Sequence, residues 1–351
     1  MLEHYVSHNH RSRKSEIRNS GRAHVRLRDK ILRARRPVVV YEILPPRIID
    51  GTIESYAESI STLLSKTHID AINIPEVHME ETRGVRPVAE NLRAEPREFG
   101  RLIQDAVGIE AIVNRVTVHE SAEVQSEWFQ STHDDYGIEN IVLVGGESSN
   151  IDYLGPSVVE STELISEINS ESGREIFCGG IAIPSRKVES VRLLKKGSGG
   201  IEYFTTQVLY DSDNISKMLG HYQDACMKEK VSPKRILLSF APISTQKNLN
   251  FLKWLGVIVP ETTEEYITAN QDTIKDRSIE VSMGVLDDIL SHISSNRIAV
   301  PIGLNIEHIM SYNFDHSVEL LQMMSKRYRK FCIETDLFDG RKDRSVEILT
   351  H

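Results

Sequence analysis

From residue 37 onward, short runs rich in Val and Ile alternate with longer stretches whose apolar residues recur at helical spacing. This alternation predicts a parallel sheet, because parallel neighbours must be joined by a crossover that a helix usually provides. Eight runs of similar length, with no glycine-rich dinucleotide fingerprint after the first, favour a closed (β/α)8 TIM barrel over an open doubly wound sheet. We expect the strands at Val38–Leu44, Ala71–Ile74, Ala111–Thr117, Asn140–Val144, Glu175–Ile183, Gly200–Thr206, Arg235–Phe240 and Ala299–Ile306.

The amphipathic stretches between these runs predict the helices that cover the barrel. No linker rich in Gly, Pro or Ser divides the chain, so residues 25–329 are expected to form one catalytic domain. Residues 330–351 form a charged tail with room for one short extra strand at Phe331–Ile333. We expect helices at Ile53–Ser65, Ala122–Ser131, Ser157–Ile168, Lys187–Lys196, Asn214–Met227 and Lys247–Leu255, and two more within Thr262–Ser295.

The amino-terminal segment has a charge opposite to that of the rest. Residues 1–36 hold eleven Lys and Arg against three Asp and Glu, whereas the whole chain has a net charge of −9. Residues 1–24 are predicted to be a flexible, solvated extension, although a basic arm can also contact an anionic partner. Val25–Arg35 is predicted to be a helix, whose apolar stripe packs across the bottom of the fold.

Composition excludes several classes of protein. The cysteines Cys178, Cys226 and Cys332 share no metal-binding spacing and are too few for a disulfide framework, which favours a reducing compartment. No apolar run approaches the roughly 20 residues that cross a bilayer, and no secretory signal is evident. We therefore expect a soluble, cytoplasmic enzyme with no membrane or nucleic-acid partner. The chain has no P-loop, no HExxH motif, no nucleophile elbow and no cysteine pair for zinc, so no bound metal is expected unless acids distant in the sequence converge.

The end of the first predicted strand holds the strongest candidate for chemistry. Glu42 is a lone carboxylate in an apolar run and is followed by Pro45 and Pro46. A glutamate here points either into the barrel mouth or under a helix, and burial in either place raises the pKa of a carboxyl group. Glu42 is thus either a proton donor or the partner of a buried cation.

Three other strand ends carry polar residues that can meet Glu42, because all βα loops gather at one face of such a barrel. The fourth strand runs into Gly145, Gly146 and Glu147, where the glycines allow a ligand to approach the backbone. The sixth ends in Thr-Thr-Gln at Gln207, whose amide offers both donors and an acceptor. The eighth brings an amide and a second acid to the same rim, at Asn305 and Glu307.

In order and spacing, these motifs resemble the methylenetetrahydrofolate reductase family. The resemblance rests on the Glu-x-x-Pro-Pro strand at Glu42, the Gly-acid turn at Glu147 and the Thr-Gln ending at Gln207. It implies a (β/α)8 oxidoreductase of one-carbon metabolism, acting on CH-NH donors and serving methionine biosynthesis. The implied reaction reduces 5,10-methylenetetrahydrofolate, or a related pterin, to the 5-methyl form with NADH or NADPH, commonly through FAD.

The resemblance also implies roles for individual residues. Glu42 corresponds to the general acid that opens the five-membered ring of the folate, and Gln207 to the glutamine that hydrogen-bonds it. Glu147 stands where the family usually has an aspartate beside folate and flavin. Glu189 and Lys196 correspond to residues that hold the ribityl and phosphate portions of the flavin. Asn305 and Glu307 are assigned to the folate, and Gly146 and Ala182 to the flavin.

The departures from the family pattern lie on the flavin side. Gly145 replaces an arginine, Ile183 replaces a tyrosine, and the second strand ends in Ile74 and Pro75 instead of a Thr-Tyr-Gly turn. These differences are more similar to a flavin-independent branch that passes hydride directly from NADH to the folate.

Two alternatives remain open from the sequence. Barrels of this shape also serve pterin-dependent or corrinoid-linked methyl transfer, since fold alone does not fix function. The chain can also be a non-catalytic relative whose basic arm binds a partner. Homo-oligomerisation is compatible with all three hypotheses.

Overall fold

The computed structural model describes residues 25–34, 36–77, 92–146, 151–309 and 313–335. Within these ranges the strands pair in chain order to form a closed barrel, and every pair is parallel. The predicted (β/α)8 barrel is therefore confirmed. The strands are β1 (Val39–Ile43), β2 (Ala71–Ile74), β3 (Glu110–Val116), β4 (Asn140–Val144), β5 (Phe177–Ala182), β6 (Tyr203–Thr206), β7 (Arg235–Phe240) and β8 (Ile302–His308).

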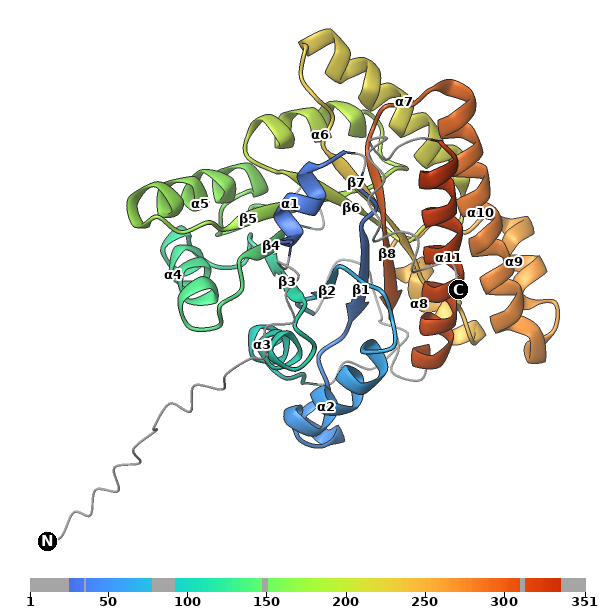
Figure 1. Ribbon diagram of the computed structural model, residues 1–351, viewed down its shortest axis with the longest axis horizontal. Helices are drawn as coiled ribbons and strands as arrows, with labels where there is room; N and C mark the ends of the chain where they lie inside the picture. The colour runs from blue at the N-terminus through green and yellow to red at the C-terminus, as the bar shows by residue number, and fades with distance from the viewer. Residues whose placement is uncertain (1–24, 35, 78–91, 147–150, 310–312, 336–351) are drawn as a thin grey trace, which may run out of the picture.

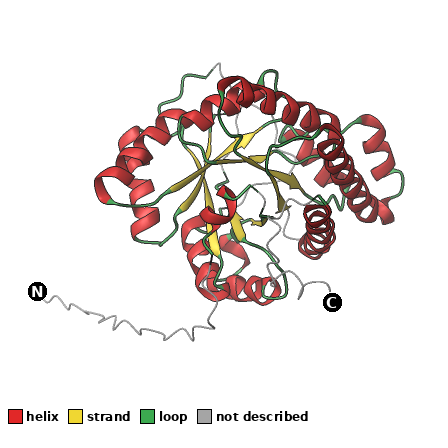
Figure 2. Cartoon of the chain, turned by 45° about the horizontal axis from the view of Figure 1, so that its top comes forward, coloured by secondary structure: helices red, strands yellow, loops and turns green. Residues whose placement is uncertain are grey.

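The helices form an outer layer around the strands, as Figure 2 shows. Several begin at a side chain that accepts a backbone N–H of the first turn, including Ser121, Ser157, Asp211 and Thr245. The helices are α1 (Leu27–Leu32), α2 (Ile53–Leu64), α3 (Pro96–Val107), α4 (Ala122–Asp134), α5 (Val158–Ser172), α6 (Glu189–Ser198), α7 (Ser212–Glu229), α8 (Gln246–Trp254), α9 (Glu261–Thr268), α10 (Ile274–Asn296) and α11 (Phe314–Glu334), with 3₁₀ turns η1 (Ile48–Asp50) and η2 (Gln271–Thr273).

Alternation along the strands separates two cores. Residues such as Val39, Tyr41 and Ile43 face the helices and belong to the large outer core. The residues between them face the barrel interior, whose lower layer is apolar. A methyl group on Gly179 would lie 2.5 Å from the Tyr203 ring, so this glycine makes room for the tyrosine. The lower layer comprises Val38, Val40, Ala71, Ile112, Val142, Phe177, Tyr203 and Leu237.

Helix α1 closes the bottom of this interior, where Leu27 and Ile31 pack against the lower layer. It crosses the end of the barrel in Figure 1. The buried Arg235 side chain of β7 fixes α1 by donating hydrogen bonds to the carbonyl oxygens of Ile31 (3.1 Å) and Arg33 (2.7 Å). The guanidinium thus satisfies carbonyls that the short helix leaves unpaired.

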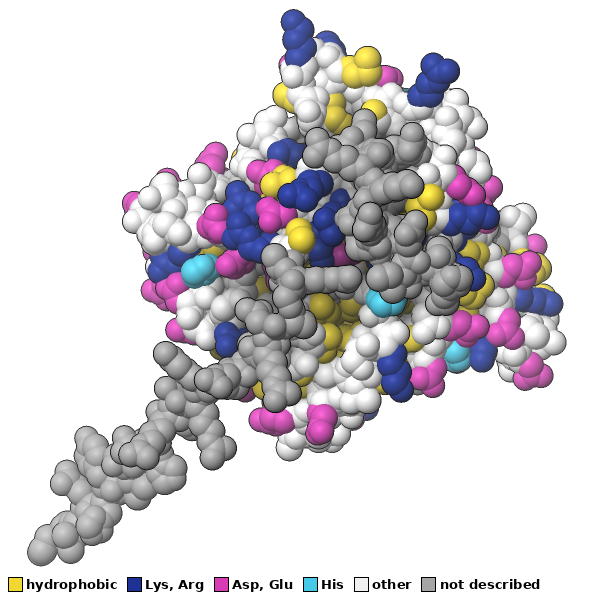
Figure 3. Space-filling model, in the orientation of Figure 1, with side chains coloured by type: hydrophobic (Ala, Val, Ile, Leu, Met, Phe, Trp, Pro, Cys, Tyr) yellow, Lys and Arg dark blue, Asp and Glu magenta, His cyan; other side chains and the backbone are white. Residues whose placement is uncertain are grey.

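Lys and Arg side chains gather around α1 on the face shown in Figure 3. Arg26 and Arg28 pair with Glu175, and the Lys30 ammonium lies 2.9 Å from the Asp70 carboxylate. The positive charges on this part of the surface are therefore balanced by acids of the barrel.

The structure corrects the sequence analysis in three places. The extra strand predicted at Phe331–Ile333 is wrong, because these residues belong to α11, whose residues from Leu320 to Cys332 bury an apolar stripe against the barrel. Helix α3 was not predicted, and α1 is shorter than the expected Val25–Arg35. Within the described ranges, no helix is long and apolar enough to cross a membrane.

Candidate active site

Above the apolar lower layer, the inward-facing positions of the strands become polar. On β1, Glu42 follows Val40 on the same face, and on β8, Asn305 and Glu307 follow Gly303. This change of polarity occurs towards the carboxyl ends of the strands, where barrels of this kind carry their active sites. The inward-facing polar residues are Glu42, Asn73, Asn114, Thr205, Ser239, Asn305 and Glu307.

Two carboxylates stand side by side in this layer. Glu42 of β1 and Glu307 of β8 are direct partners in the strand register. The amide nitrogen of Asn73 donates to Glu42 Oε2 at 2.6 Å. The amide nitrogen of Asn305 donates to Glu307 Oε1 at 3.2 Å and to Ser239 Oγ at 3.0 Å. Glu42, Asn305 and Glu307 therefore lie together on the inward face of β1 and β8, at the rim where the sequence placed them.

The surroundings favour the protonated form of both acids. Burial raises the pKa of Glu42 to about 7, against the opposing hydrogen bonds from Asn73 and Asn305. Burial and then repulsion from Glu42 raise the pKa of Glu307 well above its ordinary value. No Lys, Arg or His in the described residues forms an ion pair with either acid. The reading of Glu42 as the partner of a buried cation thus has no support here, and at neutral pH the pair can donate a proton.

The amide oxygens around the two carboxyl groups have no hydrogen-bond partners among the described residues. The Oδ1 atoms of Asn73, Asn114 and Asn305 are buried and have no hydrogen-bond partner among the described residues. Since Asn73 and Asn305 give their NH₂ groups to the carboxylates, their carbonyl oxygens remain as acceptors. The floor of the mouth therefore suits a ligand that brings N–H or O–H donors.

Gln207 directly follows β6, two residues after the inward-facing Thr205. Its side-chain nitrogen donates to the Leu255 carbonyl oxygen at 2.8 Å, and its backbone N–H donates to Ala182 O at 3.0 Å. One amide N–H and the side-chain oxygen remain available to a ligand. The neighbouring Asp211 caps α7. A hollow beside Gln207 is lined by Pro184, Ser185, Val208, Leu209, Tyr210, Asp211, Asn214 and Ile258.

Glu189 and Lys196 meet at the end of β5. Glu189 Oε1 accepts the backbone N–H of Ile183 at 3.0 Å, whereas its buried Oε2 has no partner among the described residues. The Lys196 ammonium donates to Ile181 O at 2.8 Å, and burial lowers its pKa against the attraction of Glu189. The side chain of Ala182 faces the helices, so this residue offers only its backbone to the mouth.

The turn after β4 is occupied by a tyrosine. A methyl group on Gly146 would lie 2.3 Å from Tyr153 Cε2, so the open side of this glycine is filled by the Tyr153 ring. Gly145 brings no cation, and the side chain of Ile74 faces the outer core. Glu147 lies outside the described residues.

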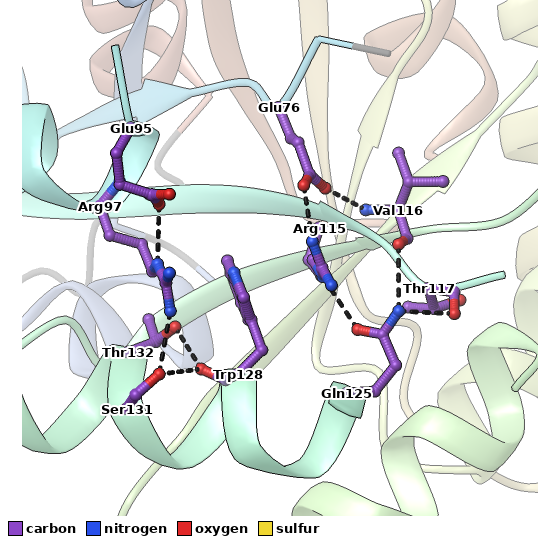
Figure 4. Close-up of polar contacts among 10 residues, drawn as sticks. All are labelled: Glu76, Glu95, Arg97, Arg115, Val116, Thr117, Gln125, Trp128, Ser131 and Thr132. Atoms are coloured by element: carbon purple, nitrogen blue, oxygen red, sulfur yellow. Dashed lines mark hydrogen bonds and ion pairs between the residues drawn. The ribbon is translucent and has the colours of Figure 1, made fainter. Parts of the chain in front are cut away.

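Beside the mouth, a polar network fixes the end of β3, as Figure 4 shows. Arg115 donates to Glu76 Oε1 at 2.6 Å and to Gln125 Oε1 at 2.8 Å, and Glu76 Oε2 accepts the Val116 N–H. The Arg115 guanidinium also lies 4.8 Å from the Trp128 ring centroid. Sequence reasoning did not find this network, since its members come from separate elements.

Within the described ranges, no group of three His, Cys, Asp or Glu side chains could hold a metal ion. The described residues of the mouth bring together a carboxyl pair that can donate a proton and amides that can form hydrogen bonds.

Comparison with known proteins adds the family. The sequence model of methylenetetrahydrofolate reductase matches residues 27–314, which include all of β1 to β8. This chain belongs to the methylenetetrahydrofolate reductase family. The resemblance drawn from Glu42, the Gly-acid turn and Gln207 is thereby confirmed. No match was found among curated protein sequences.

One of the solved structures similar to this chain shares its fold. An uncharacterised protein from Clostridium thermocellum, which binds two copies of 5-methyl-5,6,7,8-tetrahydrofolic acid, is similar with a TM-score of 0.69 and 19% identity, over 85% of this chain and 98% of that one. A GH113 β-1,4-mannanase has a TM-score of 0.44 and 10% identity, over 77% and 86% of the two chains. At 19% identity, the similarity to the Clostridium thermocellum protein shows the fold alone and leaves the reaction to the site.

Proposed function

We propose that this protein reduces 5,10-methylenetetrahydrofolate, or a closely related pterin, to its 5-methyl form with NADH or NADPH. The observation that carries the proposal is Glu42, a carboxyl at the barrel mouth whose pKa burial raises to about 7. A general acid works best when its pKa lies near the working pH. The family match and the folate bound by the Clostridium thermocellum protein support a folate as the substrate.

Each polar residue of the barrel mouth has its own role in the proposed reaction. Glu42 protonates the folate, which opens the five-membered ring to an iminium, and the iminium carbon accepts hydride. Gln207 hydrogen-bonds the pterin with the amide N–H and oxygen that Leu255 leaves available. The amide oxygens of Asn73, Asn114 and Asn305 accept N–H donors of the same ring. Glu147, which follows Gly146 in the sequence, is proposed as a further folate contact.

The family usually relies on a flavin, and the residues here do not fit one held in that way. Tyr153 fills the space that Gly146 would leave for a ring system. Glu189 Oε1 accepts the Ile183 N–H just after β5, and Lys196 Nζ donates to the Ile181 carbonyl oxygen within it. No cation stands at Gly145, and Ile183 takes the place of a tyrosine. We therefore propose that hydride passes directly from the nicotinamide to the folate.

The test is the anaerobic conversion of 5,10-methylenetetrahydrofolate to the 5-methyl product by the purified protein. NADH and NADPH are supplied in separate reactions, each with and without FAD. We expect product with a nicotinamide alone. Product only after FAD is added would contradict the direct transfer but retain the reductase. No product under any of these conditions, together with methyl transfer from 5-methyltetrahydrofolate to a thiol or corrinoid acceptor, would replace the reductase with a methyltransferase.

A further inference from the structure

We propose that Glu42 and Glu307 act as one acid, in which a single proton is shared between β1 and β8 and Glu307 stores the proton that Glu42 delivers. The identity of the proton acceptor rests on the proposed function, but the sharing itself does not. Glu307 then has a role beyond contacting the substrate.

The strand geometry forces the two acids together. Glu42 and Glu307 are partners in the register of adjacent parallel strands, which lie about 4.8 Å apart. Both side chains point into the same interior, since the residues on either side of them, Tyr41 and Ile306, belong to the outer core. The two carboxyl groups therefore lie on the same inward face of adjacent strands.

The neighbours hold the acids without neutralising them. Facing the pair are Asn73 from β2, Asn114 from β3, Thr205 from β6, Ser239 from β7 and Asn305 from β8, and none of these side chains carries a charge. Among the described residues, the Tyr210 hydroxyl also feels the charge of Glu307. This hydroxyl donates a hydrogen bond to the Ala241 carbonyl oxygen.

Two negative charges in such a place repel each other strongly. Removing the first proton from the pair leaves a carboxylate stabilised by the amides of Asn73 and Asn305. Removing the second would place like charges side by side in a poorly solvated mouth, so the last proton is retained to higher pH. The raised pKa values of both acids agree with this order.

The reaction balances with this proton. The O–H bond of Glu42 breaks and an N–H bond forms at N10 of the folate, while the bond between N10 and the methylene carbon breaks. The nitrogen at position 5 gives its lone pair to form the iminium, and hydride from the nicotinamide adds to the methylene carbon. The shared proton moves from Glu307 to Glu42 before this transfer, so the step leaves both carboxyls ionised, and water returns one proton to the pair before the next turnover.

The first test compares the pH dependence of kcat/KM in the wild type, Glu307→Gln and the surface control Glu58→Gln. A wild-type pair with one proton is still competent, so activity should persist until the last proton leaves. In Glu307→Gln only Glu42 can hold the proton, and the alkaline limb should move to lower pH by about one unit or more. An unmoved limb in Glu307→Gln would overturn the proposal, since a purely structural Glu307 would change the rate without moving the limb.

The second test does not need activity. Infrared titration follows the carbonyl stretch of protonated carboxyl groups as the pH is raised. We expect one such band to persist above neutral pH in the wild type and in Glu58→Gln, and to titrate at lower pH in both Glu42→Gln and Glu307→Gln. A band that titrates identically in all four proteins would overturn the shared proton. The expected bands in a protein without reductase activity would support the pair and refute only the proposed function.

Discussion

Glu42→Gln should make the fold more stable at alkaline pH while removing the proposed proton donor. In the folded protein, burial raises the pKa of Glu42 from its ordinary 4.5 to about 7. A group whose pKa is raised by folding contributes stability that is complete below pH 4.5 and is lost as the pH rises through 7. The Glu42 carboxyl therefore lowers the free energy of unfolding of the wild type at neutral and alkaline pH.

The size of the effect follows from the same values. A rise from 4.5 to about 7 corresponds to roughly 3 kcal/mol between pH 4 and pH 8. The Glu42 side chain is partly exposed and faces Glu307, so we expect about 2–3 kcal/mol to be observed. Glutamine keeps the shape and the hydrogen bond with Asn73, but it cannot ionise.

Urea unfolding of the wild type, Glu42→Gln and the surface control Glu58→Gln, measured from pH 5 to pH 8.5, tests this prediction. The advantage of Glu42→Gln over the wild type should grow with pH and level off above pH 7, and Glu58→Gln should follow the wild type. Parallel curves for Glu42→Gln and the wild type would show that Glu42 ionises freely in the folded protein, and the proposed acid would lose its physical basis.

Three further changes test other parts of the structure. Arg235→Met should cost about 2–4 kcal/mol of unfolding free energy, measured with urea, because the carbonyls of Ile31 and Arg33 lose their donors; unchanged stability would contradict the role of this arginine in holding α1. Gly179→Ala should cost about 1–3 kcal/mol in the same assay, since its methyl group meets the Tyr203 ring, and a neutral result would mean that the ring can move aside. Gln207→Ala should raise the KM for the folate about tenfold with little change in the KM for the nicotinamide, and the reverse pattern would move Gln207 to the nicotinamide side.

The barrel could be predicted from the sequence because the Val- and Ile-rich runs mark the individual strands, and their regular alternation with helices also indicates the fold. The Val and Ile runs at Ala71–Ile74, Asn140–Val144 and Arg235–Phe240 coincide with β2, β4 and β7. Boundaries were less accurate where polar residues continue a strand, and β8 runs on to His308. The short apolar run at Phe331–Ile333 shows the opposite difficulty, since periodicity over so few residues does not separate a strand from the last turns of a helix.

The site was predictable to the extent that chemistry lies at strand ends. Glu42, Asn305 and Glu307 could be assigned to one rim from the barrel alone. The direct pairing of Glu42 with Glu307 depends on the register between β1 and β8. These two strands are far apart in the sequence, and their pairing closes the barrel. The alternation of side chains along the strands could have placed Asn73 and Ser239 in the predicted site as well, but only once that register was known.

The most direct test of the account is reduction of 5,10-methylenetetrahydrofolate by NADH or NADPH, measured at pH 7 for the wild type, Glu42→Gln and the control Glu58→Gln. We predict 5-methyltetrahydrofolate from the wild type and Glu58→Gln, and a loss of about 10²-fold to 10⁴-fold in kcat for Glu42→Gln with folding intact. A Glu42→Gln protein that turns over at the wild-type rate would contradict the assignment of Glu42 as the acid.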